Sequence, residues 1–365
     1  MNTETPRVFI AATRQNDGKT TVSLGLLAAL QKTFKRIGYI KPVGQRFVEI
    51  AEHKIDEDTV LMDSVYKLDC PLVDMSPIAV EPDFTRKYLE SANYETLAKT
   101  INKAFDRVAW EKDFVLCEGS GHAGVGSVFD LSNAQVAKIL GAKVVIVTRG
   151  GIGKPIDEVA LNQALFEKAG VEIIGVIINK VTTDKIDYIA DFARRGLKRK
   201  GLELLGVIPH LNILSHPTLR SILEELNGEQ LNQSRHLNNL VEDVVVGAMS
   251  ASNAVQFFQP GVLVITPGDR EDLILAAAAA LCGKSGRTLA GIVLTGNLRP
   301  GESVLKIIQE MNFPVLLVKE DSYEIASKVH DLIVKTRPDD LEKISVIRDL
   351  IGRHVDVKRI LQLIN

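Results

Sequence analysis

Residues Val8 to Thr21 read Val-Phe-Ile-Ala-Ala-Thr-Arg-Gln-Asn-Asp-Gly-Lys-Thr-Thr, and this stretch decides the fold. Its apolar beginning suits a buried parallel strand, and after Thr21 the apolar residues recur at helical spacing. Between them lie a polar loop and the tripeptide Gly18-Lys19-Thr20. The order strand, loop, helix predicts an anion cradle, because loop N–H groups and the positive end of a helix surround negative charge.

The tripeptide has the chemistry of a phosphate-binding loop. Lys19 would reach the β- and γ-phosphates of a nucleotide, and the Thr20 hydroxyl would ligate the accompanying Mg²⁺ ion. The strict pattern has another glycine five residues before Gly18, where this chain has Thr13. An ordinary strand-turn-helix with a surface lysine is the alternative, and the order of elements favours phosphate binding, which makes the chain a candidate user of ATP. The residues expected to contact the nucleotide are Thr13, Gln15, Asn16, Asp17, Gly18, Lys19, Thr20 and Thr21.

The composition is typical of a globular protein. The chain has 365 residues, of which 45% are hydrophobic and 25% are charged, and its formal net charge is −2. This length favours two domains, and this charge gives no reason to expect nucleic acid or an anionic membrane as a partner. The three cysteines, Cys70, Cys117 and Cys282, lie far apart, which fits buried thiols in a reducing compartment. No signal peptide or membrane-spanning stretch is visible, so we expect a soluble cytoplasmic protein.

An α/β fold is expected for the first 210 residues, where short β-branched runs alternate with longer helical patterns. The alternation predicts a doubly wound, mainly parallel sheet with helices on both faces and ligands at the carboxyl ends of the strands. We expect strands at residues 8–12, 37–40, 114–117, 143–148, 172–179 and 204–208, and helices at 95–108, 133–140, 157–169 and 185–200.

A smaller α/β domain is expected to follow a polar boundary segment at residues 216–239. We divide the chain into a P-loop nucleotide-binding domain at 1–212, a smaller α/β domain at 213–335 and a helical tail at 336–365. In the second half we expect strands at 262–266, 291–295 and 315–318, helices at 218–226, 273–282, 302–311 and 323–335, and tail helices at 340–351 and 357–364 separated by Gly352.

Two acidic positions are candidates for holding the metal ion that accompanies a nucleotide. Glu118 ends the apolar run 114–117 and precedes the glycine-rich 119–121, so it stands at the carboxyl end of a predicted buried strand. A magnesium-coordinating carboxylate belongs there, and a solvated turn glutamate is the alternative. Asp58, with Asp56 beside it, is the second candidate ligand, and a solvated helix start is its alternative.

Lys41 and Asn179 each follow a predicted strand. Pro42 stiffens the loop after Lys41, so this ammonium could be held over the γ-phosphate or over a substrate carboxylate. Asn179 could pair with adenine through its amide donor and acceptor. A surface lysine and a turn asparagine are the alternatives, and the residues alone leave both questions open.

In the second domain, the loop at 266–272 places Arg270 among three acidic residues, between a strand and an alanine-rich helix. Acids in a first helical turn are ordinary capping chemistry, and binding of a small ligand or a neighbouring subunit is the alternative. No histidine pair at catalytic or zinc spacing and no nucleophile-elbow pattern is present, so hydride transfer and serine-type hydrolysis are not expected.

Four segments resemble dethiobiotin synthetase and the related cobyrinic acid diamide synthases: 12–21, 41–43, 118–121 and 175–179. The resemblance implies a loop that binds ATP, and it implies that Asn179 contacts the adenine. Lys19 and Lys41 would flank the transferred phosphoryl group. The metal set implied by the resemblance is Thr20, Asp58 and Glu118.

Three segments of the second domain resemble the domain known as DRTGG: 246–250, 266–272 and 293–296. A synthetase-like P-loop domain followed by this domain is similar to the N-terminal regulatory region of long bacterial phosphotransacetylases. The resemblance covers nearly the whole chain and implies a regulatory module. Neither the acetyl-transfer domain of those enzymes nor a glutamine-amidotransferase domain is found in the sequence, so we expect neither activity from it.

Together these features predict a cytoplasmic, Mg²⁺-dependent ATP-binding protein whose second domain senses or transmits the nucleotide state. We expect a regulatory homo-oligomer that acts beside a separate acyl-phosphate enzyme. The alternative is an ATP-dependent synthetase that moves the γ-phosphoryl group onto a small carboxylate or a carbamate, with Lys19 and Lys41 as catalytic residues. A protein-interaction scaffold with a vestigial loop is a third possibility, and the joint presence of Lys19, Thr20 and Glu118 weighs against it.

Overall fold

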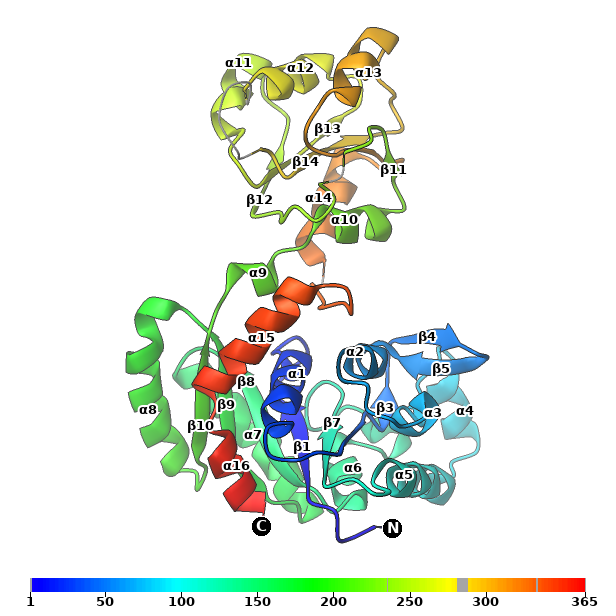
Figure 1. Cartoon of the computed structure of the whole chain (residues 1–365), viewed down its shortest axis with the longest axis vertical. Coiled ribbons are helices and arrows are strands. Elements are labelled where there is room, and N and C mark those ends of the chain that lie inside the picture. The colour runs from blue at the N-terminus through cyan, green and yellow to red at the C-terminus, as the bar shows by residue number, and fades with distance from the viewer. Residues whose placement is uncertain (1, 235, 281–287, 333, 365) are drawn as a thin grey trace. The chain divides into compact units, whose positions relative to one another are not determined.

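The computed structural model describes residues 2–234, 236–280, 288–332 and 334–364. The chain divides into two compact units (Figure 1). The first consists of Met1–His210 together with Thr336–Asn365, and the second is Leu211–Lys335. The C-terminal tail therefore belongs to the first unit, although the whole second unit separates the two in the sequence.

Six parallel strands form the centre of the first unit. They are β1 (Arg7–Ala12), β2 (Ile37–Ile40), β7 (Phe114–Glu118), β8 (Lys143–Arg149), β9 (Ile173–Val181) and β10 (Leu204–Pro209). Their order in the sheet is β10-β9-β8-β1-β7-β2, and every neighbouring pair is parallel. Every residue of β1 is buried, and because successive side chains of a strand point to opposite faces, both faces of the sheet are covered there. The expected α/β fold is confirmed.

The helices predicted for the first unit are present, with bounds that differ by a few residues. The first unit contains α1 (Lys19–Leu30), α5 (Tyr94–Val108), α6 (Asn133–Ile139), α7 (Gly153–Ala169) and α8 (Ile186–Lys198), with short 3₁₀ turns η1 (Ser127–Phe129) and η2 (Thr183–Lys185). The largest difference is in α7, which begins four residues before the predicted start at 157. Pro155 lies in its first turn, where a proline is tolerated because no intrahelical N–H bond is lost.

Between β2 and β7 the chain forms small elements that we did not predict. They are β3 (Val43–Gly44), β4 (Phe47–Ile50), β5 (His53–Asp56), α2 (Glu57–Tyr66), α3 (Leu72–Met75), β6 (Ile78–Ala79) and α4 (Phe84–Glu90). β4 and β5 form an antiparallel hairpin, and β3 pairs in parallel with β6. Asp56 caps α2 by accepting a hydrogen bond of 2.9 Å from the backbone N–H of Asp58.

The tail helices α15 (Leu341–His354) and α16 (Val357–Ile364) pack on the first unit, α15 against α1 (Figure 1). The contact is closest at Gly25, where a Cβ atom would lie 2.2 Å from Cγ1 of Ile351. The predicted separation of the helices at Gly352 was wrong, because Gly352 lies within α15. The break falls at residues 355–356, where Val355 forms a β-bridge with Gly206. An exposed glycine inside a helix costs only about 1 kcal/mol relative to alanine, so it does not have to end the helix.

A five-stranded sheet forms the centre of the second unit. Its strands are β11 (Glu229–Gln230), β12 (Asp243–Val246), β13 (Val262–Pro267), β14 (Gly291–Thr295) and β15 (Val315–Leu317). The order is β11-β15-β14-β13-β12, with β11 antiparallel and the other pairs parallel. Along β13, Val262 and Val264 enter the core on one face, and Leu263 and Ile265 enter the core on the other.

The helices of the second unit are α9 (Asn212–Ser215), α10 (Leu219–Leu226), α11 (Ala251–Ala254), α12 (Glu271–Ala280), α13 (Glu302–Gln309) and α14 (Ser322–Asp331), with the 3₁₀ turn η3 (Val255–Phe257). The predicted small α/β fold is confirmed, and β11 and β12 are additions to it. The last residues of the predicted helix 273–282, including Cys282, lie outside the described residues, as does residue 333 of the predicted helix 323–335. Among the described residues, no helix combines the length and the apolar character that crossing a membrane requires.

Candidate nucleotide site

The loop between β1 and α1 has the backbone geometry of an anion cradle. Gly18, the residue before α1, has φ of +100°, in the left-handed region that favours glycine. A Cβ atom at Gly18 would lie 2.1 Å from Nδ2 of Asn179, so only glycine fits there. The Gly18 carbonyl accepts a 2.9 Å bond from the N–H of Val22. The N–H groups of the first helical turn have no intrahelical acceptor, which leaves them available to an anion.

Thr13 and Asp17 brace the loop from inside. Asp17 is almost fully buried, and its Oδ2 accepts from the backbone N–H of Arg14 at 2.8 Å. The Thr13 hydroxyl lies 2.8 Å from the same Oδ2 and 2.9 Å from the hydroxyl of Thr148. Burial raises the pKa of Asp17. In place of the expected glycine, Thr13 therefore holds the loop by its side chain, and any contact that Thr13 and Asp17 make with a nucleotide would come from their backbone.

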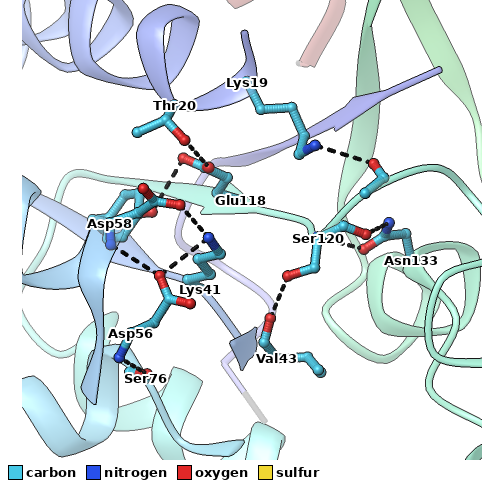
Figure 2. Close-up of polar contacts among 12 residues, drawn as sticks. Lys19, Thr20, Lys41, Val43, Asp56, Asp58, Ser76, Glu118, Ser120 and Asn133 are labelled. Carbon is cyan, nitrogen blue, oxygen red and sulfur yellow. Dashed lines mark hydrogen bonds and ion pairs between the residues drawn. The ribbon is translucent and has the colours of Figure 1, made fainter. Parts of the chain in front are cut away.

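Lys19 points from the start of α1 toward the loop after β7 (Figure 2). Its ammonium donates to the Gly121 carbonyl over 3.1 Å, and the side chain is largely buried. Burial lowers the pKa of Lys19, against an opposing contribution from Glu118. A buried cation held mainly by a backbone carbonyl is suited to accept an anionic partner.

Glu118 stands at the end of β7, between the strands that carry the loop and Lys41. The carboxylate is fully buried: Oε1 accepts from the Thr20 hydroxyl at 3.0 Å and Oε2 from the Tyr39 hydroxyl at 3.1 Å. Burial, followed by the nearby charge of Asp58, raises the pKa of Glu118. We did not single out Tyr39 from the sequence, because a tyrosine within an apolar strand is typical of a core residue.

Lys41 faces two carboxylates at the end of β2 (Figure 2). Its ammonium lies 3.1 Å from Oδ1 of Asp56 and also forms an ion pair with Oδ2 of Asp58. Burial acts to lower the pKa of Lys41, but Asp58 and Asp56 outweigh it and the pKa is raised. The structure therefore brings Lys41 and Asp58 to the site predicted for them, but as partners of each other.

The glycine-rich segment after Glu118 is held by an asparagine that the sequence analysis missed. Asn133, the first residue of α6, accepts from the N–H of Ser120 at 3.0 Å and donates to the Ser120 carbonyl at 2.6 Å (Figure 2). A Cβ atom at Gly119 would lie 2.6 Å from Oδ1 of Asn133, which explains the glycine. The contact between residues 120 and 133 forms only in the folded structure, so no local sequence pattern predicts it.

Asn179 at the end of β9 is bound to the loop backbone. Its Nδ2 donates to the Asp17 carbonyl at 2.9 Å, and its Oδ1 accepts from the N–H of Lys180 at 2.9 Å. Lys180 in turn donates from Nζ to the Asn16 carbonyl at 2.9 Å. Recognition of adenine by Asn179 stays a prediction, and it would use the second N–H and the remaining lone pair of this amide. Of the other predicted contacts, Gln15 and Asn16 are exposed, and Thr20 and Thr21 are half-buried.

A hydroxyl beside a buried carboxylate is a donor set that fits Mg²⁺, which takes few protein ligands and completes its shell with water and phosphate oxygens. Thr20 and Glu118 provide that pair. Among the described residues, no group of three or more histidine, cysteine, aspartate or glutamate side chains is arranged to hold a metal ion.

In the second unit, Arg270 fastens neighbouring loops. Its guanidinium donates to the Met249 carbonyl at 2.7 Å and pairs with Asp272 at 2.9 Å. Glu271 accepts from the N–H of Gly301 at 2.7 Å. These bonds explain Arg270, Glu271 and Asp272 as structural, and a ligand at the loop 266–272 stays a prediction.

A parallel sheet, a Gly-Lys-Thr loop between β1 and α1, and an acid at the end of the adjacent strand define a P-loop nucleotide-binding fold. The chain belongs to the AAA domain family, whose model matches residues 6–218. The DRTGG domain model matches residues 221–332.

Curated relatives cover nearly the whole chain. A phosphate acetyltransferase of Nitratidesulfovibrio vulgaris is 28% identical, and the match covers 96% of this chain and 50% of the relative. One of Pseudomonas aeruginosa is 29% identical, and the match covers 95% of this chain and 50% of the relative. The chain spans about half the length of these relatives. The predicted resemblance to the DRTGG domain and to phosphotransacetylases is confirmed.

Two solved structures resemble parts of the chain at low TM-scores. The CBS and DRTGG domains of the regulatory region of Clostridium perfringens pyrophosphatase, complexed with the activator diadenosine tetraphosphate, give a TM-score of 0.28 at 24% identity, over 38% of this chain and 63% of theirs. The MinC:MinD complex of Aquifex aeolicus gives 0.36 at 16% identity, over 57% and 83%. At these scores the likeness adds nothing to the description of the site.

Proposed function

We propose that the first unit binds ATP with Mg²⁺ and that the chain acts as a nucleotide-sensing regulatory module. The observation that carries the proposal is the contact between the Thr20 hydroxyl and the buried Glu118 carboxylate, with Lys19 beside them at the start of α1. A cation, a hydroxyl and a carboxylate around a helix N-terminus are the groups that a magnesium triphosphate requires.

Different residues of the site would bind the phosphates, the metal ion and the adenine. Backbone N–H groups of the loop 13–18 and of the first turn of α1 would hold the phosphates, and Lys19 would neutralise them. Thr20 and Glu118 would hold Mg²⁺, which when bound neutralises charge on the β- and γ-phosphates. Asn179 would reach the adenine while it keeps the loop in place.

Sensing is favoured over synthesis by the state of Lys41. A synthetase of the dethiobiotin type would use this ammonium on a substrate carboxylate or phosphoryl group, whereas here it is paired with Asp56 and Asp58. The DRTGG domain and the similarity to half of phosphate acetyltransferases also support a regulatory role beside an acyl-phosphate enzyme. We place this role in the cytoplasm and in a homo-oligomer.

Nucleotide binding is tested by the thermal stability of the full chain. At a nucleotide concentration a hundred times the Kd, binding adds about 2.7 kcal/mol to the free energy of unfolding. For a unit of this size that raises Tm by about 5–10 °C. Lys19→Ala should abolish the rise, and Lys32→Ala, an exposed lysine just after the other end of α1, should keep it. Isothermal titration that finds no saturable heat with ATP and Mg²⁺ would refute the proposal.

Sensing and synthesis are separated by ADP release. With ATP, Mg²⁺ and a panel of small carboxylates, a sensor releases ADP only at the background rate, whereas a synthetase gives a burst when its substrate is added. Such a burst, lost in Lys19→Ala, would replace the regulatory proposal with the synthetase.

A further inference from the structure

Lys41 is set rigidly at the edge of the site. It follows β2 directly, and its backbone N–H donates to the Met75 carbonyl at 2.8 Å. Its ammonium contacts the carboxylates of Asp56 and Asp58, which lie 15 and 17 residues further along the chain, at the junction of β5 and α2. The ion pairs thus join β2 to the start of α2.

The two carboxylates differ in how firmly they are held. Asp56 is almost fully buried, caps α2 through the N–H of Asp58, and donates its own N–H to the Ser76 hydroxyl at 3.0 Å. The backbone of Gly44 packs so closely that a Cβ there would lie 2.6 Å from Oδ2 of Asp56. The side chain of Asp58 is 14% exposed and lies in the first turn of α2. Asp56 is therefore the more deeply buried partner of Lys41, and Asp58 is the more exposed one.

Five charged side chains gather here, as Figure 2 shows: Lys19, Lys41, Asp56, Asp58 and Glu118. With all five side chains ionised, two positive and three negative charges sum to −1. Without Lys41 the net charge would be −2, among side chains that are mostly buried. Buried carboxylates without a cation are costly, so some positive charge must stay beside them.

We infer that Lys41 is a tethered counter-ion that holds Asp58 until a magnesium nucleotide takes over its charge. Mg²⁺ with its nucleotide would free Asp58 from Lys41, and Asp58 would then turn toward the metal held by Thr20 and Glu118. Lys41 thereby acts as a positioning residue that makes metal binding conditional on nucleotide. The role of the nucleotide in this exchange rests on the function proposed above, whereas the competition between Lys41 and a divalent cation does not.

The competition is tested on the nucleotide-free full chain by titration with Mn²⁺, whose unbound fraction is read from its electron paramagnetic resonance signal. Lys41→Met removes the tethered charge and should lower the Kd for Mn²⁺ at least tenfold relative to the wild type. Lys41→Arg keeps the charge and is the matched control, with a Kd like that of the wild type. Equal Mn²⁺ affinity in folded Lys41→Met and in the wild type would overturn the inference.

A double variant addresses the case in which Lys41→Met does not fold because it leaves buried carboxylates without a cation. Lys41→Met combined with Asp56→Asn keeps the net charge at −1 and leaves Asp58 without its lysine partner, so the gain in Mn²⁺ affinity should persist. Adding Asp58→Asn should remove it. Circular dichroism establishes that each protein is folded, and a folded double variant that binds Mn²⁺ no better than the wild type counts against the inference.

A measurement on the wild type does not depend on any variant. Reductive methylation followed by mass spectrometry reports how accessible the Lys41 ammonium is, with the exposed Lys32 as internal reference. Lys41 should react faster in the presence of Mg²⁺ and a non-hydrolysable ATP analogue, and an unchanged rate in a protein shown to bind the analogue speaks against the exchange. If the wild type binds no nucleotide while Lys41→Met gains Mn²⁺ affinity, the proposed function fails and the counter-ion role stands.

Discussion

Replacing Gly25 by alanine tests how closely the tail is bound to the helix that carries Lys19 and Thr20. A Cβ at Gly25 would lie 2.2 Å from Cγ1 and 2.4 Å from Cβ of Ile351, and 3.1 Å from the Ile347 carbonyl oxygen. The nearest atoms belong to the root of a β-branched side chain, which cannot swing away. Helices α1 and α15 must therefore move apart to accept the methyl group.

Two effects of opposite sign set the size of the change. Alanine is favoured over glycine in a helix interior by about 1 kcal/mol. Overpacking a close contact costs about 1–3 kcal/mol, and the upper part of that range applies because the contact involves Cβ and backbone atoms. The net loss of about 1–2 kcal/mol corresponds to a fall in Tm of about 2–8 °C for a unit of this size.

Gly352→Ala is the matched control, because Gly352 lies exposed in α15 with no heavy atom within 4 Å of its virtual Cβ. Only the helix-propensity effect acts there, so this variant should gain about 0.5–1 kcal/mol. Differential scanning fluorimetry of both variants gives the comparison. If Gly25→Ala raises Tm as Gly352→Ala does, the packing of α15 on α1 is not as described.

Two further predictions concern the site itself. Burial raises the pKa of Asp17, so the folded state binds a proton more readily than the unfolded state, and the stability linked to this carboxyl is lost as pH rises. The Tm of Asp17→Asn minus the Tm of the wild type should therefore increase as the pH rises from below 3.8, the ordinary pKa of an aspartate, toward neutrality. A difference in Tm that stays the same at every pH contradicts this. Glu118→Gln should still bind ATP in the absence of metal but should lose at least tenfold, about 1.4 kcal/mol, of the affinity gained with Mg²⁺. Glu95→Gln on the exposed start of α5 should behave as the wild type in the same calorimetric titration.

The sequence predicted the centre of the first unit well because its signals are local. Each strand of a parallel sheet buried on both faces appears as a short apolar run, and a Gly-Lys-Thr tripeptide after the first of them places the phosphate loop. Glu118 was recognisable because it ends such a run. The segment between β2 and β7 was not predicted, because two-residue strands such as β3 and β6 have no periodicity to detect.

The contacts that shape the site depend on residues far apart in the sequence. Thr13 was expected to contact the nucleotide, but its side chain braces Asp17 and Thr148. The pairing of Lys41 with Asp58 depends on the fold of the intervening hairpin. No local pattern carries that information, so the sequence named Lys19, Lys41 and Glu118 but neither their partners nor the roles of Tyr39 and Asn133.

The chain leaves the first unit once and returns to it once, and these two points lie on neighbouring elements of that unit. The chain departs after β10 and returns into α15, and these two are joined by the bridge between Gly206 and Val355 and by a 2.8 Å bond from the Asp356 N–H to the Leu205 carbonyl. Helix α15 also packs on α1, whose first residue is Lys19. It therefore connects the point where the chain re-enters the first unit to the helix that follows the phosphate loop. A displacement of α15 would therefore act on α1, the helix that follows the loop, and a connection of this kind is what the proposed nucleotide sensing requires.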